Sequence, residues 1–231
     1  MHVPDGFLDA PTSVATAAVA VVAVAGALRG ARRELDDRTA PLAGLVAVFV
    51  FAAQMINFPV GAGTSGHLMG GVLAAVLVGP WTATLALTVV LLVQALFFAD
   101  GGLTALGTNV TLIAVVAVWV GYGVFRLIQW LRPTSRAIIP VAAGIAALVS
   151  VPVAALVFAG LWAVGGAAPI DLGLLTTTMV GWHTVIGVGE ALITAVAVSA
   201  ILAARPDIVY AARHLRAQPS LTVRSGVEVT S

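Results

Sequence analysis

Seven long apolar runs, separated by short stretches richer in polar residues, make up most of the chain. They cover residues 12–29, 40–57, 67–81, 82–98, 106–131, 137–163 and 178–204. Such runs are typical of transmembrane helices, because about 20 residues are needed to cross a bilayer as a helix. The pattern predicts an all-α, multi-pass bundle of about seven transmembrane helices.

The third and fourth runs are adjacent, and the sequence Gly79-Pro80-Trp81 marks the boundary between them. Proline interrupts a helix because it lacks a backbone N–H, and tryptophan favours the membrane interface, so we expect two helices here. The apolar part of the third run would rise about 20 Å as a helix, less than the hydrocarbon core of roughly 30 Å. One of its ends should therefore lie inside the membrane. If that end carries His67, a pocket can form below the outer surface.

Composition excludes a soluble domain. Of the 231 residues, 60% are hydrophobic and 9% are charged, and the mean hydropathy is +1.08, which leaves too little polar surface for a soluble fold. We expect a membrane-embedded domain over residues 1–204 and a polar cytoplasmic tail over residues 205–231. No basic residues precede the first apolar run, so we expect no cleavable signal peptide and a retained Met1.

The charged residues restrict the chemistry further. All 11 basic residues are arginine, and the chain has neither lysine nor cysteine. A Walker lysine and a Schiff-base lysine are therefore excluded on this chain. A metal site cannot use thiolates and must use nitrogen or oxygen ligands.

The arginines also predict the orientation. If the N-terminus lies outside, every arginine falls in an inner loop or in the inner tail, whereas the opposite topology reverses the positive-inside rule completely. We therefore expect the N-terminus outside and the C-terminus inside. His2, His67, Asp100 and His183 then lie at or near the outer face. The arginines are Arg29, Arg32, Arg33, Arg38, Arg126, Arg132, Arg136, Arg205, Arg213, Arg216 and Arg224.

The first residues, Met1-His2-Val3-Pro4, contain a candidate metal chelate. The Met1 α-amine, the His2 backbone nitrogen and a His2 ring nitrogen can close fused five- and six-membered rings around one ion, and Pro4 stiffens the chain that follows. These three in-plane nitrogens leave one corner open, for which His67 is the candidate. A planar set of four nitrogens suits Ni(II) or Cu(II) and also admits Co(II).

Two ionisable residues fall within the last apolar run, where such residues are costly and usually face the bundle interior. His183, Gly187 and Glu190 share one face of the predicted helix. His183 and Glu190 either form a structural pair that holds helices together or act on the ion directly. Ser65, Asp100, His183 and Glu190 are the candidates for residues that surround the metal without binding it.

Two other functions would use some of these residues. Gly63-Thr64-Ser65-Gly66 together with His183 is compatible with a rhomboid-type intramembrane serine protease, in which Ser65 and His183 would form a dyad. That function leaves the Met1-His2 start unexplained. A proton-coupled metal carrier would use Asp100 and Glu190 as relays, but the membrane interior offers few other charges to couple.

Five sequence blocks occur in a fixed order: Met1 to Leu8, Phe58 to Leu68, Leu77 to Trp81, Gln94 to Gly107, and Gly181 to Ala191. Together they resemble the substrate-binding (S) component of cobalt/nickel energy-coupling factor (ECF) transporters, the CbiM/NikM family. The resemblance covers residues 1 to about 200, and five blocks in the right order are highly specific.

The resemblance implies a seven-helix bundle whose N-terminal residues 1–11 fold into an outer pocket. It also implies that the Met1 amine, the His2 backbone nitrogen and the His2 and His67 imidazoles bind Ni(II) or Co(II) as the transported ion, without a cofactor. After Asn109 the family favours a second asparagine and then methionine. This chain has Leu112 and Ile113 instead, which weakens the case for a polar contact from that turn.

The resemblance further implies a subunit that is not an enzyme, in the cell membrane of a bacterium or archaeon. It would capture the ion outside and deliver it inside together with a membrane coupling (T) component, two cytoplasmic ABC ATPases and a small accessory membrane protein. No nucleic acid is expected as a partner. The lack of a phosphate-binding loop agrees independently, and the ligand types alone do not decide between nickel and cobalt.

Overall fold

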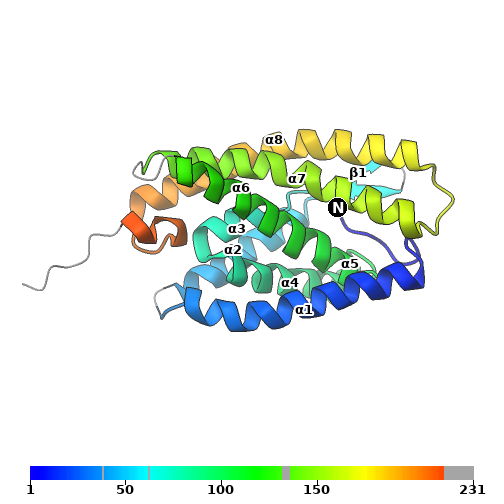
Figure 1. The fold of residues 1–231 in the computed structure, drawn as a ribbon, viewed down its shortest axis with the longest axis horizontal. Coiled ribbons are helices and arrows are strands. Elements are labelled where there is room, and N and C mark those ends of the chain that lie inside the picture. The colour runs from blue at the N-terminus through cyan, green and yellow to red at the C-terminus, as the bar shows by residue number, and fades with distance from the viewer. Residues whose placement is uncertain (38, 62, 132–135, 216–231) are drawn as a thin grey trace, which may run out of the picture.

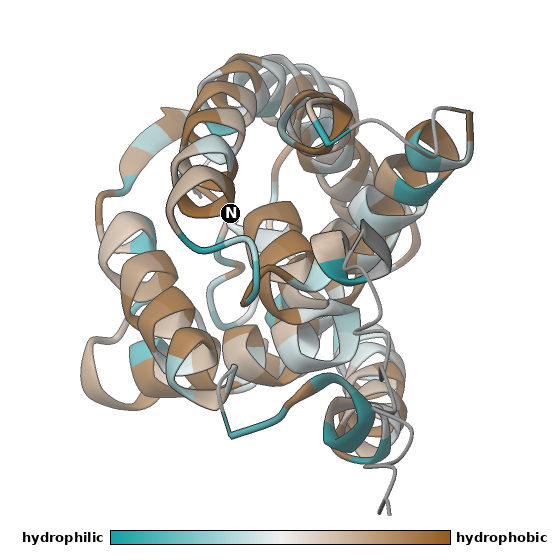
Figure 2. Ribbon diagram, turned by 90° about the vertical axis from the view of Figure 1, so that its left-hand side faces the viewer, coloured by the Kyte–Doolittle hydropathy of each residue, from teal (hydrophilic) through white to brown (hydrophobic). Residues whose placement is uncertain are grey.

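The computed structural model describes residues 1–37, 39–61, 63–131 and 136–215 as a helical bundle (Figure 1). The long helices run side by side, and Figure 2 shows them nearly end-on as a ring. The elements, in chain order, are α1 (Ala10–Glu34), α2 (Ala40–Gln54), β1 (Phe58–Gly61), β2 (Thr64–Gly66), α3 (Gly71–Val78), α4 (Pro80–Phe97), α5 (Leu106–Asn109), the π-helix η1 (Val110–Ala117), α6 (Val118–Leu131), α7 (Ile138–Gly165), α8 (Leu172–Ala204) and the 3-10 helix η2 (Tyr210–Leu215).

Among the described residues, five helices are long and apolar enough to cross a membrane: α1, α4, the continuous segment Leu106–Leu131, α7 and α8. The prediction of a helical multi-pass membrane protein is therefore confirmed. Each predicted run contains a helix, but α2 has 15 residues and α3 has 8, so both are shorter than a full span. The count of seven transmembrane helices stays a prediction.

The helix boundaries follow from local chemistry. The Asp9 carboxylate accepts the N–H of Thr12 at 2.9 Å and so caps α1, and the Asp171 carboxylate caps α8 through Leu174 N–H at 2.8 Å. Gly79, with φ +98°, ends α3 and is followed directly by Pro80 at the start of α4. The predicted helix break at this glycine and proline is confirmed.

A short antiparallel hairpin connects α2 to α3, where the sequence predicted only a connection. Strands β1 and β2 pair Phe58 with Gly66 and Pro59 with Ser65. The hairpin packs on α8, where the Phe58 and Trp182 rings meet edge-on at 6.1 Å. Gly66 is required there, because a Cβ atom would lie 2.6 Å from side chains of Val60 and Ile186.

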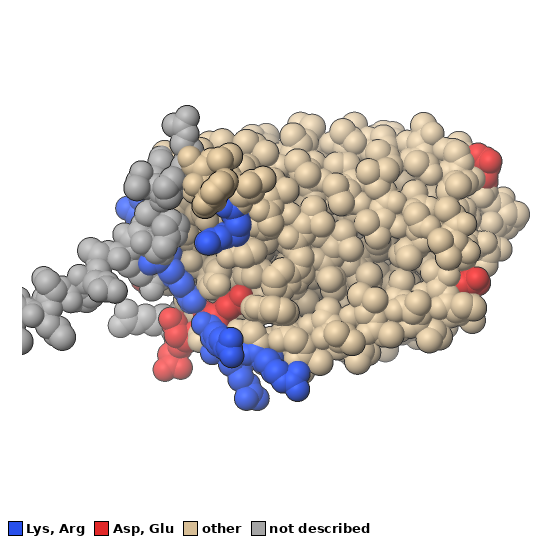
Figure 3. Space-filling view, in the orientation of Figure 1, with Lys and Arg blue, Asp and Glu red and all other residues tan. Residues whose placement is uncertain are grey.

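The surface divides into an uncharged belt and a charged end. Large apolar side chains are exposed around the belt, among them Val22, Leu45, Val164 and Leu192, as expected for lipid contact. In Figure 3 the arginines of the visible face lie at the end of the bundle that carries η2. This distribution is the one that the predicted orientation requires, and the direction of insertion itself stays a prediction.

The described part of the predicted cytoplasmic tail packs against the bundle. Val209, Ala211 and Ala212 are buried, and Arg213 donates to the backbone carbonyl of Glu34 at the end of α1. Residues 216–231 of the predicted tail lie outside the described residues.

Candidate metal centre

The N-terminal segment enters the ring of helices, and both ribbon views place the N-terminus within it (Figures 1 and 2). Met1, His2 and Val3 are 1%, 6% and 1% exposed. The Val3 N–H donates to Asn109 Oδ1 at 2.7 Å, and the Val3 carbonyl accepts from Asn109 Nδ2 at 3.1 Å and from the Gly102 N–H at 2.9 Å. Both backbone polar groups of Val3 are therefore hydrogen-bonded. These bonds hold the positions of Met1 and His2, which precede it.

Further along, the same segment is tied to two loops. The Asp5 carboxylate accepts the backbone N–H of Thr104 at 2.7 Å, and the Asp9 N–H donates to the Gly165 carbonyl at 2.7 Å. Gly102 has to be a glycine, because a side chain there would clash with Asp5. The contacts of Asp5 with Thr104 and Gly102 join two of the sequence blocks, Met1 to Leu8 and Gln94 to Gly107.

The imidazoles of His2 and His67 stack on each other, with ring centroids 4.3 Å apart and 24° between the planes. The Nδ1 atom of His67 lies 2.8 Å from the Leu68 carbonyl, which makes Nδ1 the protonated nitrogen and leaves the Nε2 lone pair free. His67 Nε2 and His2 Nε2 are buried without a hydrogen-bond partner, and His2 Nδ1 has only the Asp100 carboxylate beside it, at 3.1 Å. Buried polar atoms are normally paired, so this group of nitrogens is prepared for a ligand.

Burial also prepares the N-terminus for metal binding. It lowers the pKa of the Met1 α-amine from 8.0 to about 4, because the charged form loses its hydration. Burial likewise lowers the pKa of the His2 imidazole. Both groups are therefore neutral at pH 7, and a neutral nitrogen is the form that binds a metal ion.

The loop that follows His67 is clamped by two buried side chains. The Glu190 carboxylate of α8 accepts the N–H of Met69 at 2.7 Å and that of Gly70 at 2.9 Å. The Gln54 Nε2 atom of α2 donates to the Met69 carbonyl at 2.9 Å. Glu190 therefore caps the first turn of α3 from another helix and fixes the position of His67.

The four residues that were expected to surround the metal without binding it do not all lie near His2. Asp100 Oδ1 lies 3.1 Å from His2 Nδ1, and Asp100 also accepts from Asn57 Nδ2 at 3.2 Å. Ser65 lies on β2 and lines, with His2, Asn57 and Asp100, an open cavity of about 460 Å³. Of the two stacked histidines, His2 lines this cavity.

His183 and Glu190 are buried on the inward face of α8, as predicted. They do not form a pair, because Glu190 bonds to the loop of Met69 and Gly70 while His183 Nδ1 bonds to the Met179 carbonyl at 2.8 Å. The interpretation of a structural His-Glu pair is therefore wrong. The second nitrogen of His183 is buried and has no partner.

The protease alternative requires a bond between Ser65 and His183, and this bond is absent. One His183 nitrogen bonds to Met179 and the other has no partner. The proton-carrier alternative is also weak, because Asp100 lies beside His2 at the outer cavity and Glu190 is engaged with two backbone N–H groups.

Sequence reasoning missed three amide side chains. Gln54 holds the His67 loop, and Asn109 holds Val3, whereas Leu112 and Ile113 after it are apolar core residues. Gln94 is 0% exposed, lies beside the His2 ring and has both amide atoms unpartnered. The available signal was an amide residue inside an apolar run, where it is as unusual as a charge.

No cluster of three or more His, Cys, Asp or Glu side chains able to hold a metal occurs within the described ranges. The predicted ligand set needs none, because two of its four nitrogens belong to the main chain.

Comparisons with known proteins identify the family of this chain. The sequence profile of CbiM, described as cobalt uptake substrate-specific transmembrane region, matches residues 2–208. A protein of Haloquadratum walsbyi named for metal transport is 43% identical over 91% of this chain and 94% of its own length. The fused nickel transport protein NikMN of Rhodobacter capsulatus is 36% identical over 97% of this chain and 68% of its own length.

Two solved structures are also similar. A crystal structure of a transition metal transporter matches with a TM-score of 0.72 and 31% identity, over 94% of this chain and 100% of that one. A truncated transition metal transporter gives a TM-score of 0.71 at 33% identity, over 88% of this chain and 99% of that one. The chain is a multi-pass membrane component of cobalt/nickel transport and not an enzyme, and it belongs to the CbiM family of cobalt uptake substrate-specific transmembrane proteins.

Proposed function

We propose that the chain is the substrate-specific subunit of an ECF-type transporter, which captures Ni(II) or Co(II) outside the cell for delivery to the cytoplasm. The Met1 α-amine, the His2 backbone nitrogen, the His2 imidazole and His67 Nε2 bind the ion. The observation that carries this proposal is the stacked, buried His2 and His67 pair, in which the two Nε2 atoms have no partner, beside a buried amine.

The proposed ligand set requires a small rearrangement. A ring that includes the His2 backbone nitrogen closes through His2 Nδ1, which lies 3.1 Å from Asp100. On binding, the ion replaces Asp100 at this nitrogen, and the His67 ring turns from stacking to bring Nε2 to the open corner. The Nε2 atom of His2 then requires an acceptor, which the unpartnered Gln94 amide provides.

Four nitrogens in one plane favour Ni(II) over metals that prefer tetrahedral or octahedral oxygen sites. Cobalt fits the same ligands. The relatives differ in the same way, because one is named for nickel and another, from Sorangium cellulosum, is named as the cobalt transport protein CbiM. Which ion this chain carries is decided by competitive titration of the purified protein with both ions.

Delivery to the cytoplasm requires partners, because the chain has no lysine for a phosphate-binding loop. We assign ATP hydrolysis to two cytoplasmic ABC ATPases and transmission to a membrane coupling protein, with a small accessory membrane protein in the complex. Cells that express the chain with these partners should accumulate nickel or cobalt in an ATP-dependent manner. Accumulation that persists without the ATPases would contradict the assembly.

The orientation can be tested with cysteine probes, because the natural chain has no cysteine. Leu103 is 56% exposed in the loop after α4, and Asp37 is exposed in the loop after α1. In intact cells, Leu103→Cys should react with a membrane-impermeant thiol reagent and Asp37→Cys should react only after the cells are opened. The reverse pattern would place the metal site on the cytoplasmic side.

Removing the Glu190 clamp should weaken metal binding without touching a ligand. Glu190→Leu leaves the N–H groups of Met69 and Gly70 buried without acceptors, so His67 loses its fixed position. We expect nickel affinity to fall about 10- to 100-fold, the range found when partners of metal-binding residues are lost. Thr194→Val, four residues further on the same buried face, is the matched control and should bind as the natural chain does. Equal affinities in both variants would show that the clamp does not position His67.

A further inference from the structure

The arginine-rich end of the bundle contains a second cavity that shares no lining residue with the outer one. Its volume is about 470 Å³, and its walls come from α1, the start of α4, α6 and η2. The lining includes two arginines and four aromatic residues: Arg29, Arg33, Trp81, Trp119, Tyr122 and Tyr210. The proposed metal site uses none of them.

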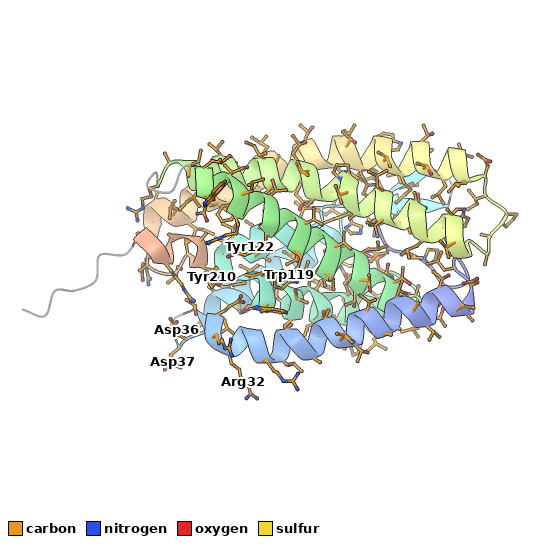
Figure 4. All side chains as sticks on the ribbon, in the orientation of Figure 1. Arg32, Asp36, Asp37, Trp119, Tyr122 and Tyr210 are labelled. Carbon is orange, nitrogen blue, oxygen red and sulfur yellow. The ribbon has the colours of Figure 1, made fainter. Side chains whose placement is uncertain are left out.

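Aromatic rings form much of the wall. The Trp81 ring lies directly over Gly30 of α1, where no side chain would fit, and it meets the Trp119 ring edge-on at 4.4 Å. Tyr122 and Tyr210 add two more rings, 6.5 Å apart. Figure 4 shows Trp119, Tyr122 and Tyr210 grouped at this end of the bundle. Tryptophan and tyrosine favour the level of the lipid headgroups.

The cavity carries an excess of positive charge at its mouth. Arg29 and Arg33 are exposed and lie one turn apart on α1, so they share a face. In the part of the chain that the structure describes, neither belongs to an ion pair. The Asp36 carboxylate lies 4.0 Å from the Arg213 guanidinium.

The acidic group in the wall, Glu34, is already engaged. Its carboxylate is 3% exposed and accepts the N–H groups of Trp81 at 3.2 Å and Thr82 at 2.7 Å. The positive end of α4 therefore offsets its charge. Two guanidinium groups remain to bind an anion that enters from the membrane interface.

The surface next to the cavity is apolar and exposed. Val19 and Val22 of α1 are 49% and 73% exposed and lie on the same helix face as Gly26 and Arg29, at spacings of three and four residues, and only 22% of the apolar part of α1 is buried. A ligand that fits both features has an anionic head and long apolar tails. A soluble phosphate ester would satisfy the arginines but would leave this face uncovered.

We propose that this cavity binds the phosphate headgroup of an anionic phospholipid, from the leaflet at the arginine end of the bundle. Arg29 and Arg33 pair with the phosphodiester, the aromatic rings surround the glycerol, and the acyl chains lie along the exposed face of α1. The bound lipid links α1, α4, α6 and η2, so it stabilises this corner of the fold.

The test uses the full chain purified in a neutral detergent, with phosphatidylglycerol or phosphatidylcholine of identical acyl chains added to the micelles. We expect phosphatidylglycerol to raise the unfolding temperature by several degrees and to remain bound in native mass spectrometry, whereas phosphatidylcholine does neither. The double variant Arg29→Gln/Arg33→Gln should retain at least five-fold less phosphatidylglycerol. Arg32→Gln is the matched control, because Arg32 is exposed on the same turn, projects away from the bundle (Figure 4) and does not line the cavity.

Because each variant is compared with itself in the two lipids, a general loss of stability does not imitate loss of the site. The proposal is overturned if Arg32→Gln loses as much lipid as the double variant, since the effect is then surface charge alone. It is also overturned if both lipids stabilise equally. If glycerol 3-phosphate alone produces the full rise in unfolding temperature, the ligand is a soluble phosphate ester and not a lipid.

Discussion

His67→Ala should remove nearly all high-affinity nickel binding from the purified protein. Loss of a residue that only orients a ligand costs 10- to 100-fold in affinity, so loss of a ligand should cost more than about 100-fold. The change also removes the stack on His2 and the hydrogen bond to the Leu68 carbonyl, so the unfolding temperature should fall somewhat while the bundle stays folded. Isothermal titration with Ni(II), together with a thermal unfolding curve in the absence of metal, measures both effects.

Ser65→Ala is the control for the His67 variant. Ser65 lines the outer cavity and is not among the proposed ligands, so this variant should keep most of the binding and most of the cellular accumulation. If Ser65→Ala abolished accumulation while His67→Ala preserved it, the assigned ligand set would be wrong. Cleavage of membrane substrates that depends on Ser65 would restore the protease alternative.

The sequence predicted the helical membrane architecture because apolar runs of about 20 residues have the length and composition that a helix needs to cross the bilayer. It also predicted the break between α3 and α4, because Gly79 needs a positive φ and Pro80 cannot donate a hydrogen bond. The family membership followed from five blocks in order and is confirmed by the match over residues 2–208.

The candidate site was only partly predictable. The Met1 and His2 chelate can be read from two adjacent residues, and the structure brings His67 next to His2. The clamp at Met69 and Gly70 was not predictable, because Glu190 acts there on backbone N–H groups about 120 residues away in the chain. A side chain that pairs with a main chain leaves no complementary residue type in the sequence.

The hairpin Phe58–Gly66 was also not predictable from the sequence. Three of its nine residues are glycine, and one is proline, so the segment has few of the alternating apolar residues that indicate strands. Its structure depends on packing against α8, through Phe58 and Trp182. Gln94 was missed for another reason, since only ionisable residues within the apolar runs were expected to be functional, and glutamine is neutral.

The second large expected effect is a loss of nickel affinity when the N-terminus is extended, because the proposed site uses the Met1 α-amine as a ligand. One glycine added before Met1 moves the α-amine away from His2 and converts the Met1 nitrogen into an amide, so the chelate loses a ligand. The buried position of Met1, with 1% exposure, leaves no room for the added residue. Nickel affinity should therefore fall more than about 100-fold, by the same reasoning as for His67. His2→Ala should cause a similar loss by removing the ring nitrogen.

An added residue can also displace the whole N-terminal segment, so the control must separate displacement from ligand loss. Met1→Leu, released from a cleavable N-terminal fusion so that leucine is the first residue, keeps a free amine and a side chain of similar volume, and it should bind nickel as the natural chain does. The three proteins should carry the same C-terminal tag, and mass spectrometry should verify each N-terminus. Their unfolding temperatures without metal should agree within a few degrees, which shows that the bundle is intact.

The most direct measurement is the Ni(II) titration of the natural chain, the Met1→Leu variant and the glycine-extended chain under identical conditions. We expect equal tight binding by the first two and a loss of more than about 100-fold in the third. If the extended chain binds nickel as tightly as the natural chain, the α-amine is not a ligand and the proposed metal site is wrong.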